Sequence, residues 1–290
     1  MLSPHDRQAV DGFLADAAES HGAHLGDHLR ADLAHGPREG FVAAMAFADD
    51  TLRGYAQAST GNDGFVVDVV APDDATTRLE LLRAVIAQLP RHEAVTWWSH
   101  APEADRPVAG ALGLVAHRSL LQMRRPLPLD GSVSFGPVAE VRPFVVGVDE
   151  TAWLEVNNAA FAWHGEQGGW DLATLQQRER EPWFDPSGFL LHERDGRLAA
   201  FCWTKLHRHH DHDAVVGEIY VIAVHPDFHG LGLGRALTVA GLRSLHASGA
   251  TVGMLYVDAD NDAAVQLYTA LGFATAHTDQ AYTRPEGSTR

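Results

Sequence analysis

Three glycines at alternate positions are the first feature of this sequence that suits ligand binding. The segment HPDFHGLGLGR carries Gly230, Gly232 and Gly234 between an apolar run and a run with helical spacing. Glycine lets backbone N–H groups approach a ligand without a Cβ in the way, and a helix N-terminus adds unpaired N–H groups and the positive end of the helix dipole. The segment therefore suits a pyrophosphate.

On this pattern alone, a flexible turn and a dinucleotide site remain open as alternatives. Against the dinucleotide site, the spacing is not the G-x-G-x-x-G of a Rossmann fold, and the preceding strand comes late in its domain. A Walker A loop would continue with Lys-Ser or Lys-Thr, whereas Arg235 follows here.

Two side chains near the turn suit acid–base chemistry on an acyl group. Acyl transfer to an amine needs a neutral amine, a polarised carbonyl and a proton for the leaving group. Glu218, on the strand before the turn, could remove an ammonium proton directly or through water. Tyr268 could protonate a thiolate, since a phenol has a pKa of about 10, and the backbone N–H of Val224 could point at the carbonyl oxygen. A surface carboxylate and a core-edge aromatic are the alternatives for the two side chains.

The surrounding sequence predicts the elements that would position these groups. LLHERDGRLAAFCWTK indicates a hairpin around Asp195-Gly196, and VGEIYVIAVHP indicates a long strand that Pro226 stops. RALTVAGLRSLHASG predicts a helix capped at Gly249, VGMLYV a strand, and DAAVQLYTALG a helix that Asn261 caps. The order is that of a mixed α/β domain.

The two halves of the chain repeat each other weakly. Ala-Leu-Gly ends at Gly113 and again at Gly272, 159 residues later, and VVAP and AVHP end 154 residues apart. Each proline closes an apolar strand before a predicted helix. We therefore expect two copies of one fold, residues 1–130 and 140–290, joined by the turn-rich segment 126–137.

Composition narrows the classes of partner and compartment. A formal net charge of −16 argues against nucleic acid and anionic membranes as partners. The single cysteine, Cys202, and the absence of a signal peptide or transmembrane segment in the sequence predict a cytoplasmic protein, which we expect to be monomeric. Lys205 is the one lysine among the 22 lysine and arginine residues. Genomic drift is one explanation for a single lysine, and a function for Lys205 is the other.

A histidine-rich run, LHRHHDHDAVV, could suggest a metal site. Its histidines, His207, His209, His210 and His212, fall in a predicted loop without cysteine and without the spacing of structural zinc sites. We interpret the run as a solvated loop and expect no metal.

Together these features resemble a known superfamily. The strand ending in V-H-P, the Gly-x-Gly turn and the Asn-capped helix with Tyr268 resemble the acyl-CoA core of the GNAT acetyltransferases. Upstream, VNNAAFAWHGEQGGW, EPWFDPSG, FCWTKLH and GEIYVIAVHP resemble the mycothiol synthases of actinobacteria, and QMRRPL resembles the end of their N-terminal half.

This resemblance implies an α/β fold (α+β mixed sheet) of two tandem GNAT domains, with acetyl-CoA as co-substrate and the cysteinyl amine of Cys-GlcN-Ins as acceptor. It assigns the base role to Glu218 and the acid role to Tyr268. It implies substrate contacts at Asp27, Glu166, Lys205, Glu218 and Tyr256. For acetyl-CoA it implies Ile222, Ala223, Val224, His229, Gly230, Leu231, Gly232, Leu233, Gly234, Arg235, Asn261, Asp262, Ala263, Ala264, Val265 and Gln266.

The sequence departs from the superfamily pattern in two places. His229 stands where Arg or Gln usually opens the turn, so we expect weaker or pH-dependent binding of acetyl-CoA. After VVAP, the first half has Asp73 and Asp74 in place of glycines, so we expect it to keep the fold and lack the chemistry. A tandem GNAT enzyme for another amine and a non-catalytic acyl-CoA sensor are the alternative functions, and the second conflicts with the presence of Glu218 and Tyr268.

Overall fold

The computed structural model describes residues 2–21, 25–35, 40–61, 64–72, 74–130, 136, 139–162, 167–207 and 215–284. The chain divides into two compact units: unit 1 is Met1–Leu120 with Thr278–Arg290, and unit 2 is Leu121–His277. We expected a division between residues 130 and 140. The division instead falls inside two strands, β5 (Val115–Pro126) and β11 (Ala274–Thr283), each of which begins in one unit and ends in the other. The hydrophobic periodicity of the sequence could not show that these strands pass from one unit to the other, because both ends of each strand are equally extended.

Unit 1 contains a sheet in the order β1-β2-β3-β4, with the C-terminal end of β11 paired antiparallel to β4. Its elements besides those two shared strands are α1 (Pro4–His21), α2 (Asp27–His35), β1 (Val42–Ala48), β2 (Thr51–Gly61), β3 (Gly64–Val70), α3 (Ala75–Ile86), β4 (Val95–Ser99) and α4 (Pro102–Ala111). His100 fastens β11 to this sheet, because its Nδ1 lies 2.8 Å from Asp279 and its Nε2 lies 3.8 Å from Asp68. Burial opposes the charge on His100, but the two carboxylates outweigh it and raise the pKa of His100 to about 10.

Unit 2 contains a sheet in the order β5-β10-β9-β8-β7-β6, in which β9 and β10 are parallel and β7, β8 and β9 antiparallel. Its further elements are β6 (Arg142–Pro143), α5 (Glu150–Ala160), α6 (Leu172–Glu179), η1 (Pro186–Gly188), β7 (Phe189–Arg194), β8 (Arg197–His207), β9 (Val216–Val224), η2 (Pro226–Phe228), α7 (Leu233–Ala247), β10 (Val252–Asp258) and α8 (Asp262–Ala270). Among the described residues, no helix is both long and apolar enough to span a bilayer.

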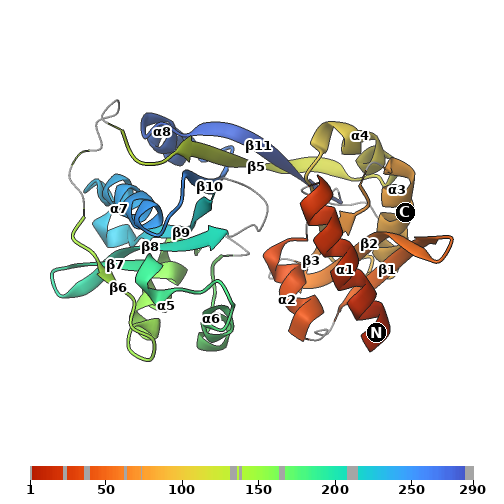
Figure 1. Ribbon diagram of the computed structural model, residues 1–290, viewed down its shortest axis with the longest axis horizontal. Helices are drawn as coiled ribbons and strands as arrows, with labels where there is room; N and C mark the ends of the chain where they lie inside the picture. The colour runs from red at the N-terminus through yellow and green to blue at the C-terminus, as the bar shows by residue number, and fades with distance from the viewer. Residues whose placement is uncertain are drawn as a thin grey trace. The chain divides into compact units, whose positions relative to one another are not determined.

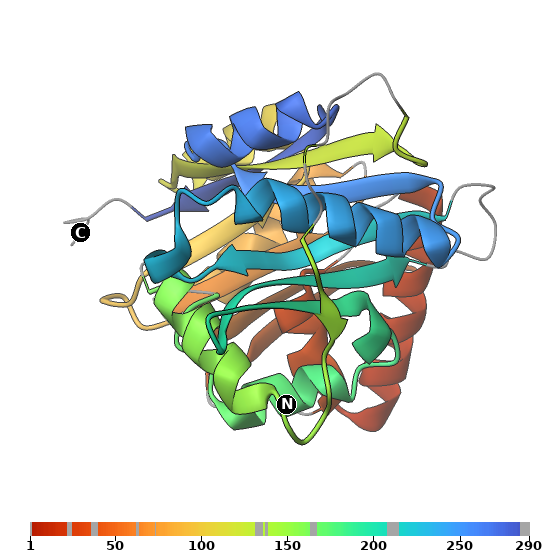
Figure 2. The same ribbon diagram turned by 90° about the vertical axis from the view of Figure 1, so that its left-hand side faces the viewer.

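Helices lie on both faces of the unit 2 sheet (Figures 1 and 2). Each face carries its own apolar cluster. On one face α7 and α8 pack against alternate residues of β8 and β9, such as Cys202 and Ile219. On the other face α5 and α6 cover an aromatic cluster in which Phe189 and Trp203 stack 4.3 Å apart. The alternation follows from the two-residue period of a strand, so each position on β8 and β9 belongs to one face.

The sheet opens between β9 and β10. The two strands pair only from Val216–Val252 to Ile219–Leu255, although β9 continues to Val224 and β10 to Asp258. A bulge adjoins this point, because Trp203 pairs with Val221 and Thr204 with Ile219, which leaves Tyr220 as an extra residue on β9. A bulge bends its strand, and the bend accompanies the parting of β9 from β10.

The local signals of the second half are confirmed. Asp195 and Gly196 have φ of 53° and 73° between β7 and β8, the left-handed pair that a two-residue hairpin needs. Asn261 caps α8 by accepting a hydrogen bond from the N–H of Ala264 at 3.2 Å. Gly249, with φ of 97°, follows the end of α7.

Unit 1 repeats the order of strands and helices found in unit 2, but the N-terminus of its helix α3 differs from that of α7. The N–H groups that open α3 are taken up by its own cap, because the Asp74 carboxylate accepts from Thr76 N and Thr77 N, both at 3.0 Å. At the start of α7 the cap is Gly232, which offers no side chain. An anion at the start of α3 would therefore meet a carboxylate whose pKa is lowered, chiefly by the hydrogen bond from the Thr77 hydroxyl. Asp73 lies outside the described residues.

The packing of α7 on β8 yields a prediction for Gly241. A Cβ at this position would lie 2.6 Å from the sulfur of Cys202, which is fully buried. Gly241→Ala should therefore destabilise the fold by about 1–3 kcal/mol, although Gly-to-Ala replacement inside a helix usually gains about 0.5–1 kcal/mol. Urea unfolding measures the difference. In a Cys202→Ala background the same change should become neutral or stabilising, and equal effects in both backgrounds would contradict this account.

Candidate active site

One row of side chains crosses the sheet of unit 2 at the point where it opens. The pairing sets Lys205 of β8 opposite Glu218 of β9, and Glu218 beside Met254 of β10. Paired residues point to the same face, and so do residues two apart on one strand, so Tyr256 shares this face. Ile219 packs under α7, so its neighbour Glu218 points away from α7. The structure thus brings together Lys205, Glu218 and Tyr256, three residues that the sequence proposed.

Glu218 is buried and has a close partner that the sequence did not indicate. Its Oε2 lies 2.7 Å from Nε2 of His207. We placed His207 in a solvated loop, and this was wrong: it is the last residue of β8, paired with Val216. The missed signal was strand alternation, because the spacing of two from Lys205 puts His207 on the face of Glu218. His209, His210 and His212 lie outside the described residues.

Aromatic rings surround the ammonium group of Lys205. Its Nζ lies 4.7 Å from the ring centroid of Trp183 and 5.3 Å from that of Tyr220, both within cation–π range. These two rings contact each other edge to face at 4.9 Å and rest on the aromatic cluster under α5. The bulge residue Tyr220 therefore contacts Lys205 directly. From the sequence we interpreted Trp183 as a core or pocket-wall residue and did not single out Tyr220, since aromatic residues in an apolar run look alike whether they line a core or a site.

Tyr256 carries a second polar contact on the same face. Its hydroxyl accepts a hydrogen bond of 2.7 Å from Nε2 of Gln122 on β5. Gln122 in turn accepts from Nε of Arg124, also at 2.7 Å. The contact fixes the phenol of Tyr256, and Gln122 was missed because it lies 134 residues away in the sequence.

Tyr268 belongs to the other face of the sheet. Its ring packs in the cluster under α7, edge to face with Phe273 at 5.9 Å. Burial raises the pKa of Tyr268, because a phenolate would lose its hydration. The nearby thiol of Cys202 is affected by the same burial, which raises its pKa to about 12. Glu218 and Tyr268 therefore lie on opposite sides of the opening between β9 and β10.

The residues expected to bind acetyl-CoA lie on three segments that share one apolar cluster. Ile222, Val224, Leu233, Ala264 and Val265 all pack in it or against it. The remaining members are Ala223 on β9, the exposed residues His229, Gly230, Leu231 and Gly232 of the turn, Gly234 and Arg235 at the start of α7, and Asn261, Asp262, Ala263 and Gln266 at the start of α8.

The turn itself has the geometry that its glycines predict. Gly230 and Gly232 have φ of 77° and 75°, which other residues rarely adopt. Nε2 of His229 lies 3.0 Å from the carbonyl oxygen of Val224, so the imidazole joins the turn to the end of β9. The turn leaves the N–H groups of the first turn of α7 with no side-chain cap, and these groups fit a phosphate.

Two further expected substrate contacts, Glu166 and Asp27, remain predictions. Glu166 lies outside the described residues. Asp27 is the first residue of α2 in unit 1. Within the described ranges, no group of three histidine, cysteine or acidic side chains is arranged to hold a metal ion.

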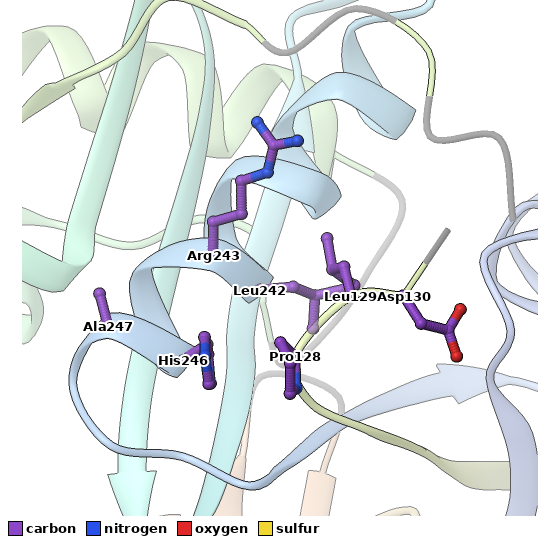
Figure 3. A pocket seen from close by; sticks show the side chains of 7 residues that line it. All are labelled: Pro128, Leu129, Asp130, Leu242, Arg243, His246 and Ala247. Carbon is purple, nitrogen blue, oxygen red and sulfur yellow. The ribbon is translucent and has the colours of Figure 1, made fainter. Parts of the chain in front are cut away.

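A hollow of about 430 Å³ lies elsewhere on unit 2, between the second half of α7 and residues 128–130 (Figure 3). Leu129 and Leu242 lie close together there, and the guanidinium of Arg243 points away from them. None of the residues proposed for acetyl-CoA or substrate lines this hollow.

Fold and turn together define a GNAT acetyltransferase. A family model described as "Acetyltransferase (GNAT) family" matches residues 154–273. A GCN5-related N-acetyltransferase from Sphaerobacter thermophilus has the same fold, with a TM-score of 0.69 at 20% identity over 97% of this chain and 93% of that chain. A tandem GNAT protein from the clavulanic acid biosynthesis pathway gives 0.65 at 14% identity, over 96% and 94%.

Sequence similarity narrows the class. The mycothiol acetyltransferase of Streptomyces avermitilis is 43% identical over 290 aligned residues, which cover 97% of this chain and 92% of that protein. The chain belongs to the mycothiol acetyltransferase family.

The different helix starts in the two units predict how many acetyl-CoA molecules bind. Calorimetry should give one site per chain, because α7 offers uncapped N–H groups whereas Asp74 occupies those of α3. Gly232→Val should abolish the site, since valine rarely adopts a φ of 75° and its side chain would stand in the space proposed for the phosphate.

Gly249→Val is the matched control. Both glycines have positive φ, 75° and 97°, and open space where a Cβ would stand. The two valine variants should therefore strain the backbone similarly, and they differ in that only position 232 lies in the glycine turn. Two equivalent tight sites in the unmodified chain, or equal loss of binding in both variants, would refute the assignment.

Proposed function

We propose that this chain transfers the acetyl group of acetyl-CoA to the cysteinyl amine of Cys-GlcN-Ins, which gives mycothiol. The observation that carries the proposal is the placement of Glu218 and Tyr268 on opposite sides of the opening between β9 and β10. An amine can then approach on the side of the carboxylate while a thiolate leaves on the side of the phenol. The similarity to mycothiol acetyltransferases over nearly the whole chain supports the identity of the amine.

Acetyl-CoA supplies an acetyl group activated as a thioester. We propose that the turn 229–235 and the start of α8 hold its phosphates and pantetheine. The end of β9, which has parted from β10, leaves backbone groups near Val224 to bind the acyl arm in the manner of an added strand. There the N–H of Val224 can stabilise negative charge on the carbonyl oxygen.

Glu218 acts as general base in this proposal. The substrate amine is an ammonium group at neutral pH and must lose a proton before it can attack. The buried carboxylate of Glu218, which lies beside Lys205 and His207, can accept that proton. The charge of Lys205 keeps it from acting as a base, so its proposed part is to hold the substrate.

Tyr268 acts as general acid. Its raised pKa keeps the phenol protonated at neutral pH. A thiolate released in the same apolar surroundings also becomes more basic, as the buried Cys202 illustrates. The proton transfer from phenol to thiolate therefore stays favourable enough to serve catalysis.

The proposal includes a location and an assembly state. The lone cysteine is buried, which suits a reducing cytoplasm, and we propose that the enzyme acts there as a monomer. A GNAT enzyme for another small amine would keep Glu218 and Tyr268, so rates with a panel of amines distinguish the two functions. Rapid acetylation of Cys-GlcN-Ins, with other amines far slower, is the expected result.

Replacing the base tests the reaction directly. Glu218→Gln should lower kcat by about two to four orders of magnitude, since that is the usual worth of general base catalysis, while calorimetric binding of acetyl-CoA stays near normal. The residual rate should rise with pH, because the amine then loses its proton to solvent. Glu193→Gln, on the exposed part of β7, is the control and should keep full activity. A near-normal rate for Glu218→Gln at pH 7 would exclude it as the base.

Replacing the lysine tests substrate binding. An ammonium group can donate up to three hydrogen bonds to sugar hydroxyls, and losing such charged bonds costs about 1.5–3 kcal/mol. Lys205→Met should therefore raise the KM for Cys-GlcN-Ins about tenfold or more, with kcat and the KM for acetyl-CoA little changed. Lys205→Arg should restore binding only in part, because the planar guanidinium needs more room between Trp183 and Tyr220.

Arg194→Met, at the exposed end of β7, removes a cation elsewhere and should leave both KM values unchanged. A main effect of Lys205→Met on kcat would overturn the binding role.

A further inference from the structure

The contact between His207 and Glu218 lies outside the acid–base pair proposed above. The two residues are a diagonal pair on neighbouring strands: His207 stands two positions beyond Lys205, the residue opposite Glu218. Nε2 and Oε2 lie 2.7 Å apart, which is a short, charge-assisted distance for nitrogen and oxygen. An ionised carboxylate only accepts hydrogen bonds, so Nε2 carries the hydrogen and donates it to Glu218.

A buried carboxylate needs such donors to stay ionised. The side chain of Glu218 is 10% exposed and that of His207 is 24% exposed, so water solvates the carboxylate poorly. Among the described residues that face it, β8 contributes the charge of Lys205 as well as His207, β9 contributes the phenol of Tyr220, and β10 contributes the uncharged Met254 and the phenol of Tyr256. Of the described residues that the strand pairing and contacts set beside the carboxylate, Lys205 and His207, both on β8, carry N–H donors.

Oε2 of Glu218 therefore accepts a hydrogen bond from His207, and Oε1 is the oxygen that would accept a proton from the substrate. A carboxylate has two oxygens, and a general base must keep one pointed at the proton that it removes. The bond from His207 to Oε2 fixes the plane of the carboxylate and leaves Oε1 for the substrate ammonium. Lys205 cannot replace His207 in this task, because its ammonium group lies over the rings of Trp183 and Tyr220.

We infer that His207 is a positioning residue, whose Nε2–H donates a hydrogen bond to Oε2 of Glu218 and turns the other oxygen toward the acceptor amine. The inference rests on the proposed base role of Glu218. It assigns one member of the histidine-rich run to the reaction.

A pair of substitutions separates the donor from the bulk of the imidazole. His207→Phe keeps a flat ring of similar size and removes the donor. His207→Gln keeps a donor near the position of Nε2. The Phe variant should lower kcat about tenfold or more, with little change in the KM for acetyl-CoA. Its rate should fall off at a higher pH on the acid side, because a buried carboxylate without that donor takes up a proton more easily. The Gln variant should keep the wild-type pH profile and most of the rate.

His246→Phe is the matched control, because His246 is exposed on the last turn of α7 and its Nδ1 lies 3.3 Å from the Ala250 carbonyl oxygen. It should behave as the wild type. Equal losses in the Phe and Gln variants of His207, or an unchanged acid limb in the Phe variant, would overturn the inference in favour of a packing role. Failure of the proposed function gives a different result, since the unmodified chain would then not acetylate Cys-GlcN-Ins at all.

Discussion

β9 and β10 are hydrogen-bonded for four residue pairs and then part, while both strands continue for several residues. The rest of unit 2 is arranged around this opening. The extra residue Tyr220 bends β9, α7 and α8 cover one face, and the Lys205–Glu218 row lies on the other. A closed sheet would separate the two faces completely, so a base and an acid on opposite faces could not act on one acyl group. In the proposed reaction, the parting of the strands gives the base and the acid access to the same acyl group.

The chain has a net charge of −16, and the positive potential at Glu218 and at the glycine turn comes from groups close to each of them. Around Glu218, two groups from β8, Lys205 and His207, supply the positive potential that the chain as a whole lacks. At the turn, backbone N–H groups of α7 take the place of basic side chains. Both solutions act over one hydrogen-bond length, where solvent screening and distant acidic residues matter little.

The two units show how one order of elements can keep or lose chemistry. In unit 1 the ladder between β2 and β3 runs from Tyr55–Val70 to Gly61–Gly64 without a bulge. The carboxylate on β3, Asp68, accepts from the N–H of Gly26 at 3.1 Å and is thus bound within the unit. The helix start that corresponds to the glycine turn is capped by Asp74. Asp68 and Asp74 are thus hydrogen-bonded within unit 1, whereas Glu218 and the N–H groups at the start of α7 face the opening and the turn of unit 2.

The sequence alone predicted the α/β class, the hairpin at Asp195-Gly196, the cap at Asn261 and the glycine turn, because each depends on residues close together in the chain. Lys205 and Glu218 lie on strands that follow each other in the sequence, and such strands commonly pair, as these two do in antiparallel fashion. Only the tertiary structure showed that β5 and β11 each pass from one unit to the other. It alone also showed the hydrogen bond from Gln122 to Tyr256 and the bulge at Tyr220. It also decided that His207 meets Glu218. These features depend on register and on contacts between distant segments, and a shift of one residue in register would move every side chain to the other face.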